Sequence, residues 1–233
     1  GGEGGGGGGA APPPPPSDVG CTMLAPRARK AAERPEAEEL FLASHGSPRD
    51  FPANRLDESR QPLDLSATNS WSRRLGEVST QELLQTLAAN AAAPFILCSR
   101  LAPALAPCDG DARCGHIVNV SALEGKFSVK KKGAGHPHTN MGKAALNMLT
   151  HTSAHDYYAR FQVLMNCVDT GWVTDNAPGG VGAVAQMHAT FIAAPLDEED
   201  GAARVLDPVF MHLADPKWLV RGQFLRNYYV AGW

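Results

Sequence analysis

The side chains best suited to proton transfer lie together near the middle of this sequence. His136, His138 and Thr139 are followed by Lys143, so two imidazoles, a hydroxyl and an amine occupy one short stretch. An imidazole exchanges a proton near neutral pH, whereas an aliphatic hydroxyl titrates far above a phenol, whose pKa is about 10. Residues four apart share one face of a helix, so Thr139 and Lys143 would lie side by side. The cluster predicts acid–base chemistry in which a histidine is better suited than Thr139 to exchange the proton.

Two other interpretations of the histidines stay open. The pair resembles the start of a metal site, but the sequence places no third ligand, and we expect no metal. Pro137 suits the first turn of a helix, in which case His136 and His138 simply mark where that helix begins. The five cysteines do not have zinc-binding spacing: they are Cys21, Cys98, Cys108, Cys114 and Cys167.

A long helix is expected upstream of this cluster. Ser79-Thr80-Gln81-Glu82 matches a capping box, in which the Ser79 hydroxyl accepts a backbone N–H and Glu82 reaches back. Apolar residues at helical spacing then predict a helix over about 80–102. Pro94 should bend this helix or shift its register rather than end it.

Short apolar runs between helical segments predict buried strands of a parallel sheet. These strands cover about 115–121, 161–168 and 222–225. One further helix is expected over about 138–158, and another begins near Asp197, where acidic residues favour the helix dipole. The alternation of helix and strand predicts an α/β fold, a partial Rossmann-like doubly wound parallel sheet.

The residues before the first helix divide into two parts. Residues 1–45 begin with a glycine run and five prolines, which predict a low-complexity, disordered tail. A phosphate-binding glycine loop is not favoured, since it needs a strand before it and a helix after it. Residues 46–78 predict an irregular loop region, which leaves 79–233 as the folded part. Because the chain begins with Gly1, we interpret it as a fragment or an imperfect gene product.

Composition narrows the setting in which the protein works. Hydrophobic residues make up 43% and charged residues 19%, which suits a soluble globular domain. A formal net charge of −3 does not favour nucleic acid or an anionic membrane surface as a partner. The sequence contains no uninterrupted run of about 18 apolar residues, so it predicts no membrane span. Cysteines without a disulfide pattern favour a reducing compartment. We expect a cytoplasmic protein, with organelle targeting left open.

Four motifs occur in an order that is known from one enzyme family. Asn90 is followed five residues later by Phe95, and the expected strand at 115–121 ends in Asn119-Val120-Ser121-Ala122. Next come Thr139-Asn140-Met141-Gly142-Lys143 and Asn166-Cys167-Val168-Asp169-Thr170-Gly171. These pieces resemble the active-site Asn, the Asn-Val-Ser-Ser strand, the Tyr-x-x-x-Lys helix and the Asn-x-Val-x-Pro-Gly turn of the short-chain dehydrogenase/reductase family. The resemblance covers the C-terminal half of that family's fold.

The resemblance implies catalytic roles for some of these residues. Asn90 would serve a water-linked proton relay, and Lys143 would bind the cofactor ribose and assist the proton donor. The family's Ser corresponds to Ala122, which has no hydroxyl, and Ser121 beside it should point to the other face of the strand. The family's Tyr corresponds to Thr139.

Other roles follow from the same resemblance. His138 is the nearest group to Thr139 that titrates in a useful range, although on a helix it should point about 100° away from Thr139. Asn119, Gly171 and Thr174 match positions that bind the cofactor together with Lys143. The implied cofactor is NAD or NADP, and the implied assembly is a homodimer or homotetramer. The small-molecule substrate is not indicated.

Two classes of function therefore stay open. The first is an NAD(P)-linked oxidoreductase, active in a full-length form. The sequence has no Gly-rich turn after an apolar strand, so we expect this chain alone to be inactive and to bind a dinucleotide weakly. The second is a non-catalytic protein that uses the same fold for binding or oligomerisation, or a truncated gene product.

Overall fold

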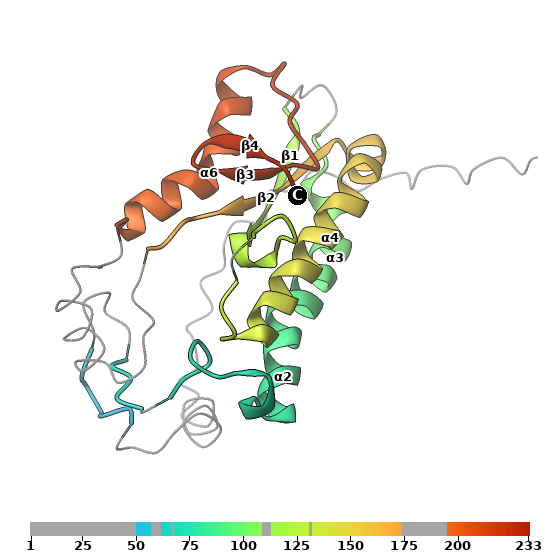
Figure 1. Ribbon diagram of the computed structural model, residues 1–233. Coiled ribbons are helices and arrows are strands. Elements are labelled where there is room, and N and C mark those ends of the chain that lie inside the picture. The colour runs from blue at the N-terminus through green and yellow to red at the C-terminus, as the bar shows by residue number, and fades with distance from the viewer. Residues whose placement is uncertain (1–49, 57–61, 67, 109–112, 131, 174–194) are drawn as a thin grey trace, which may run out of the picture. The chain divides into compact units, whose positions relative to one another are not determined.

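A parallel sheet organises the described part of the chain (Figure 1), which comprises residues 50–56, 62–66, 68–108, 113–130, 132–173 and 195–233. The computed structural model has strands β1 (Gly115–Ser121), β2 (Val163–Asp169), β3 (Phe224–Arg226) and β4 (Tyr229–Ala231), arranged in that order. β1, β2 and β3 are parallel, and β4 runs antiparallel to β3. The predicted tail at 1–45 lies outside the described residues.

Strands β1 and β2 form the longest pairing in the sheet. Their register aligns Gly115 with Val163 and Ser121 with Asp169, so both strands end at the same edge. All seven residues of β2 are buried, as expected for a strand covered on both faces. β1 lies at the edge of the sheet, and β2 is its one strand partner among the described residues.

Helices lie on both faces of the sheet. The helices α3 (Ala93–Leu105) and α4 (Pro137–Phe161) lie on one side, and α6 (Glu198–Ala214) lies on the other (Figure 1). Cys98 of α3, Ala154 of α4 and Met165 of β2 form a buried apolar cluster that joins the first layer to the sheet. This arrangement confirms the α/β fold with a Rossmann-like parallel sheet.

The first predicted helix is interrupted rather than continuous. α2 (Thr80–Leu87) leads into a π-helical turn, η2 (Ala88–Ala92), which continues into α3. Pro94 lies at the start of α3. A π turn inserts an extra residue, so the helix changes register just before Pro94, which is the second of the two outcomes predicted for this proline.

Two strand predictions near the C-terminus need correction. The strand predicted at 161–168 begins at Val163, because α4 continues to Phe161 and Gln162 ends it in the left-handed conformation, with φ 53°. The strand predicted at 222–225 begins at Phe224. β4 was not predicted at all. Its hairpin turns at Asn227 and Tyr228, both with positive φ, without the Asn-Gly pair that signals such turns.

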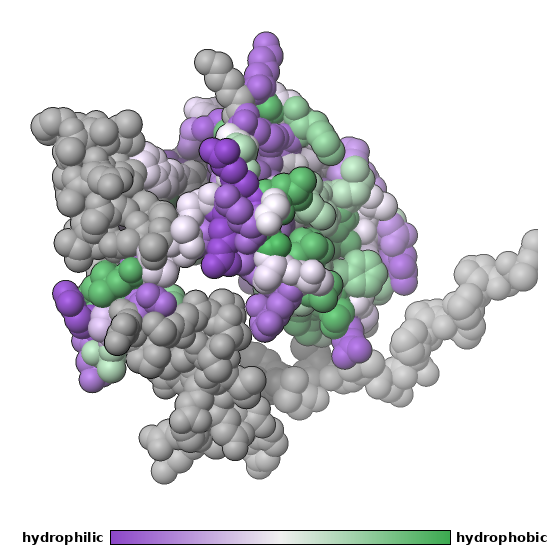
Figure 2. Space-filling model, turned by 60° about the horizontal axis from the view of Figure 1, so that its bottom comes forward, coloured by the Kyte–Doolittle hydropathy of each residue, from purple (hydrophilic) through white to green (hydrophobic). Residues whose placement is uncertain are grey.

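Apolar side chains remain exposed on the outer side of the first helical layer. Leu84, Phe95, Leu97, Leu101 and Met148 are between 48% and 62% exposed. Figure 2 shows hydrophobic side chains gathered on the side of the molecule where α2, α3 and α4 lie.

The helical stretch Thr80–Leu105 is also long and apolar enough to cross a membrane, which the search for an uninterrupted apolar run missed. One such helix is weak support for a membrane span, because the core helix of a soluble protein passes the same test.

Candidate active site

A hollow beside the edge strand β1 brings several of the predicted site residues together. Its volume is about 440 Å³, and η2, α3, β1 and α4 all contribute to its walls. Asn90, Asn119 and Lys143 line it, among apolar side chains that include Pro94, Leu97, Leu101, Ile117 and Leu146. A concave, mostly apolar surface with a few convergent polar groups is typical of a small-molecule site.

Lys143 places its ammonium group at the end of β1. Its Nζ donates a hydrogen bond to the Val120 carbonyl oxygen at 3.0 Å. Burial lowers the pKa of Lys143 below its ordinary value. An ammonium group has three N–H donors, so the bond to Val120 leaves two for a ligand in the hollow.

The position of Asn90 depends on a close approach between η2 and α4. A Cβ atom added to Gly142 would lie 2.9 Å from the Cβ of Asn90, so only glycine allows this packing. The Asn90 amide donates to the Thr86 carbonyl oxygen at 3.0 Å. The π turn and Gly142 together hold Asn90 at the wall of the hollow.

Asn119 belongs to a buried polar network as well as to the hollow. Its amide donates to the Thr150 hydroxyl at 2.8 Å, and the Cys98 thiol donates to its carbonyl oxygen at 3.8 Å. The Cys167 thiol lies 3.1 Å from the same Thr150 hydroxyl. Burial raises the pKa of Cys167 to about 12, so this thiol stays neutral. The network ties β1 to α3 and α4.

Ser121 lies outside the hollow, in a buried pair with Asn147. The Ser121 hydroxyl donates to the Asn147 side-chain oxygen, and Ser121 is only 4% exposed. The Asn147 Nδ2 atom has no hydrogen-bond partner among the described residues. Ala122, the next residue, offers no hydroxyl in its place. The geometry gives Ser121 a packing role between β1 and α4.

Thr139 uses its hydroxyl at the start of α4. The hydroxyl donates to the His136 carbonyl oxygen at 2.8 Å and lies 3.0 Å from the His136 ring nitrogen Nδ1. His136 itself precedes the helix in the left-handed conformation, with φ 41° and ψ 48°. Thr139 and His136 therefore form one hydrogen-bonded unit.

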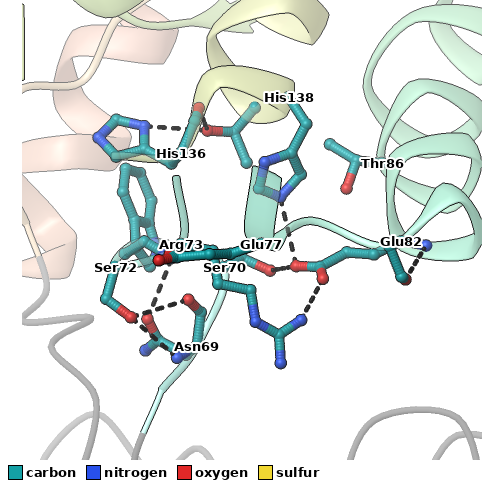
Figure 3. Close-up of polar contacts among 12 residues, drawn as sticks. Asn69, Ser70, Ser72, Arg73, Glu77, Glu82, Thr86, His136 and His138 are labelled. Carbon is teal, nitrogen blue, oxygen red and sulfur yellow. Dashed lines mark hydrogen bonds and ion pairs between the residues drawn. The ribbon is translucent and has the colours of Figure 1, made fainter. Parts of the chain in front are cut away.

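His138 points away from that unit and toward α2 (Figure 3). It is 2% exposed, and its Nε2 lies 3.3 Å from a carboxylate oxygen of Glu82. Glu82 also accepts hydrogen bonds from Ser70 and Arg73. Burial opposes the charged form of Glu82, but these bonds outweigh it and hold the pKa of the carboxyl below its ordinary value. His138 is thus a partner of Glu82 rather than a neighbour of Thr139.

The same contacts correct the predicted capping box. The Ser79 hydroxyl accepts the backbone N–H of Glu82 at 3.1 Å, as predicted. The Glu82 carboxylate, however, binds Ser70, Arg73 and His138, so it does not serve the cap in the expected way. Side chains outside the first turn of the helix have replaced the local partner.

The turn after β2 has the form that its sequence predicts. Gly171 has φ 78°, and its N–H donates to the Asp169 carboxylate at 2.9 Å. Asp169 therefore forms an Asx turn, and it also pairs with Arg226 at 3.6 Å. Thr174 lies outside the described residues. Within the described ranges, no group of three or more His, Cys, Asp or Glu residues could hold a metal ion.

The segment Asn69–Arg73 was missed as part of this region. The Trp71 ring lies 4.6 Å from the His136 ring in an edge-to-face contact, and the His136 N–H donates to the Arg73 carbonyl oxygen at 2.8 Å. These residues fall in the stretch predicted as an irregular loop. Only the tryptophan, an unusual residue for such a loop, could have signalled a packed segment.

A protein family and a viral protein are similar to this chain in sequence. The sequence profile of the family described as Enoyl-(Acyl carrier protein) reductase matches residues 65–223. An uncharacterised protein of Acanthamoeba polyphaga mimivirus is 28% identical over 168 residues, which cover 70% of this chain and 34% of that protein. This chain thus spans about a third of the length of that curated relative.

A solved structure shares the fold of this chain. A short-chain dehydrogenase/reductase from Burkholderia multivorans with bound NADP is 22% identical, with a TM-score of 0.50. The match covers 86% of this chain and 74% of that one. The carbonyl reductase Sniffer of D. melanogaster is 23% identical, with a TM-score of 0.49, and the match covers 70% of this chain and 61% of Sniffer.

Proposed function

Because the chain belongs to the short-chain dehydrogenase/reductase family, we propose that its full-length form is an NAD(P)-linked oxidoreductase acting on a small carbonyl or alcohol compound. The observation that carries this proposal is that Asn90 and Lys143 line one hollow. They stand at the positions where the family resemblance puts a proton-relay Asn and a ribose-binding Lys. NADP bound to the Burkholderia relative supports a nicotinamide cofactor.

The residues around the hollow fit the ribose end of a nicotinamide nucleotide. Lys143 keeps two N–H donors free of its bond to Val120, and these suit ribose hydroxyl oxygens. When bound, the cofactor supplies or accepts the hydride. The positive charge of Lys143 would stabilise negative charge that develops on a nearby substrate oxygen.

Two positions depart from the pattern that the resemblance implies. Ala122 stands at the Ser position and cannot hold a substrate oxygen, and Thr139 stands at the Tyr position. A hydroxyl engaged with a backbone carbonyl, as that of Thr139 is, makes a poor proton donor. In this proposal the proton is exchanged by another group.

The proposal is tested with the 233-residue chain and with the longest product of its gene. We expect the longer product to oxidise NADH or NADPH in the presence of some members of a panel of aldehydes and ketones. Lys143→Ala should reduce turnover by roughly a hundredfold, the scale of lost charge stabilisation. Lys130→Ala, on an exposed loop, is the matched control. Full activity of Lys143→Ala would contradict the proposal.

A second candidate function, pairing of subunits without catalysis, is favoured by the exposed apolar side chains of α2, α3 and α4. The same surface would support the homodimer or homotetramer expected of a full-length protein. Sedimentation velocity at tens of micromolar tests the assembly. A charged substitution such as Leu84→Glu should dissociate it, since Leu84 is 62% exposed and lies outside the hollow. A monomer at that concentration would count against both the homodimer and the homotetramer.

A further inference from the structure

The start of α4 holds a histidine whose hydrogen atoms can be assigned from geometry. The Thr139 hydroxyl lies 2.8 Å from the His136 carbonyl oxygen and 3.0 Å from His136 Nδ1. A carbonyl oxygen only accepts, so the single hydroxyl proton must lie on the first of these bonds. The hydroxyl oxygen then accepts at the second, which requires a hydrogen on Nδ1. In its neutral form His136 is therefore the Nδ1–H tautomer, with its lone pair on Nε2.

One contact holds this ring in place, and two further features fix the backbone that carries it. Trp71 lies edge-to-face against it at 4.6 Å, and the His136 N–H donates to the Arg73 carbonyl oxygen at 2.8 Å. The preceding residue, Gly135, passes so close that an added Cβ atom would lie 2.7 Å from the Trp71 carbonyl oxygen. The Arg73 contact is a backbone hydrogen bond and involves neither ring nitrogen of His136.

The backbone of His136 is strained as well as fixed. A left-handed conformation is unfavourable at a residue other than glycine, and it persists only where the surroundings impose it. His138, two residues later, has an ordinary helical position and an ion pair with Glu82. Figure 3 shows the two rings pointing in different directions, with His138 directed at Glu82.

We propose that His136 is the acid–base residue of this protein and that Thr139 is its positioning residue. The inference rests on the proposed oxidoreductase function. In the reducing direction, the protonated His136 gives the hydrogen on Nε2 to the substrate carbonyl oxygen while the carbonyl carbon gains hydride from the reduced nicotinamide. The products are the alcohol, the oxidised nicotinamide and neutral His136 with its hydrogen on Nδ1. The oxidising direction reverses each transfer, and Nε2 takes the alcohol proton.

The tautomer is measured first, in the 233-residue chain and without any assay of activity. Long-range ¹H–¹⁵N correlation spectra distinguish the two tautomers, and the signal lost in His136→Gln identifies the ring. We expect hydrogen on Nδ1 in the wild type and in Thr139→Ser, and a change toward hydrogen on Nε2 in Thr139→Val. Hydrogen on Nε2 in the wild type would overturn the assignment of roles.

The catalytic role is measured in the longest product of the gene. His136→Gln should lower turnover by a hundredfold or more and should remove one ionisation from the pH dependence of kcat. His155→Gln, an exposed histidine of α4, should do neither, and Thr139→Ser should keep more activity than Thr139→Val. Normal turnover in His136→Gln would overturn this inference and leave the oxidoreductase proposal standing. An absence of any turnover with cofactor bound would overturn both.

Discussion

At the scale of single residues, the buried pair of Ser121 and Asn147 offers the clearest stability test. Ser121 donates to the Asn147 side-chain oxygen, while the Asn147 Nδ2 has no partner among the described residues. Ser121→Ala should lower the free energy of unfolding by about 1–3 kcal/mol, because it leaves a second buried polar atom of Asn147 unpaired. Urea denaturation followed by circular dichroism measures the change.

A double-mutant cycle separates this pairing from the loss of packing. Replacing both partners, as Ser121→Ala with Asn147→Leu, removes the unpaired groups and should recover part of the loss. Strictly additive effects of the two substitutions would show that the pair contributes nothing beyond its separate side chains. Such a result would also reopen a catalytic role for Ser121.

At the scale of elements, the contact of η2 with α4 depends on one glycine. An alanine in a helix is favoured over glycine by about 1 kcal/mol. Gly142→Ala should nevertheless destabilise the protein by about 1–3 kcal/mol, because its Cβ would meet the Asn90 Cβ at 2.9 Å and force the helices apart. Thermal unfolding tests this expectation. Gly76→Ala, whose Cβ would meet nothing within 4 Å, should leave stability unchanged.

The contact between β1 and α6 should make stability depend on pH. His116 of β1 lies 5.2 Å from the His212 ring of α6. Burial, with a smaller effect from His212, lowers the pKa of His116 from 6.5 to about 4. Between these two values the unfolded chain binds a proton that the folded chain does not. Stability is therefore complete above about pH 6.5 and decreases as the pH falls toward about 4.

The measurement compares urea unfolding at several pH values in the wild type and in His116→Phe. The free energy of unfolding of the variant should change less steeply with pH. Its slope should be smaller than that of the wild type by less than about 1.4 kcal/mol per pH unit. His155→Gln, in which an exposed histidine is replaced, should behave as the wild type. An equal slope in His116→Phe would show that His116 does not cause the dependence.

Some elements could be predicted from sequence and others could not, for physical reasons. The strand at 115–121 and the helix starting at Asp197 are set by local signals, an apolar run and an N-terminal cap, and both appear as predicted. The π turn at Ala88–Ala92 depends on packing against Gly142, and no local pattern indicates it. The partner of His138 is Glu82, which local reasoning had assigned to a helix cap.

Part of the candidate site could likewise be predicted from the sequence, and part could not. Family resemblance alone identified Asn90, Asn119 and Lys143, and the structure brings all three to one hollow. It favoured His138 over His136, whereas the structure directs the His138 ring to Glu82 and holds His136 in a left-handed backbone beside Trp71, a residue from a distant segment. The direction of a side chain at a helix start depends on tertiary contacts rather than on the spacing of residues in the sequence.

At the scale of the whole molecule, we expect the edge position of β1 to weaken dinucleotide binding by this chain. A dinucleotide is held in large part by its pyrophosphate, which needs a Gly-rich turn and the N-terminus of a helix after a parallel strand. The sequence has no such turn after an apolar strand, and the described residues place no strand beyond β1. Lys143 and Asn90 would engage the ribose end only.

We therefore predict that the 233-residue chain binds NAD and NADP weakly. Titration followed by heat or by nicotinamide fluorescence should give a Kd well above ~10 μM. The free energy of binding is then weaker than −8.2 kcal/mol, the value that corresponds to a Kd of about 1 μM. The longest product of the gene should bind more tightly, and Lys143→Ala should weaken its binding. Low-micromolar binding by the 233-residue chain would show the prediction to be wrong. It would mean that the hollow beside β1, with Lys143 and Asn90 in its wall, suffices to hold the cofactor without a Gly-rich turn.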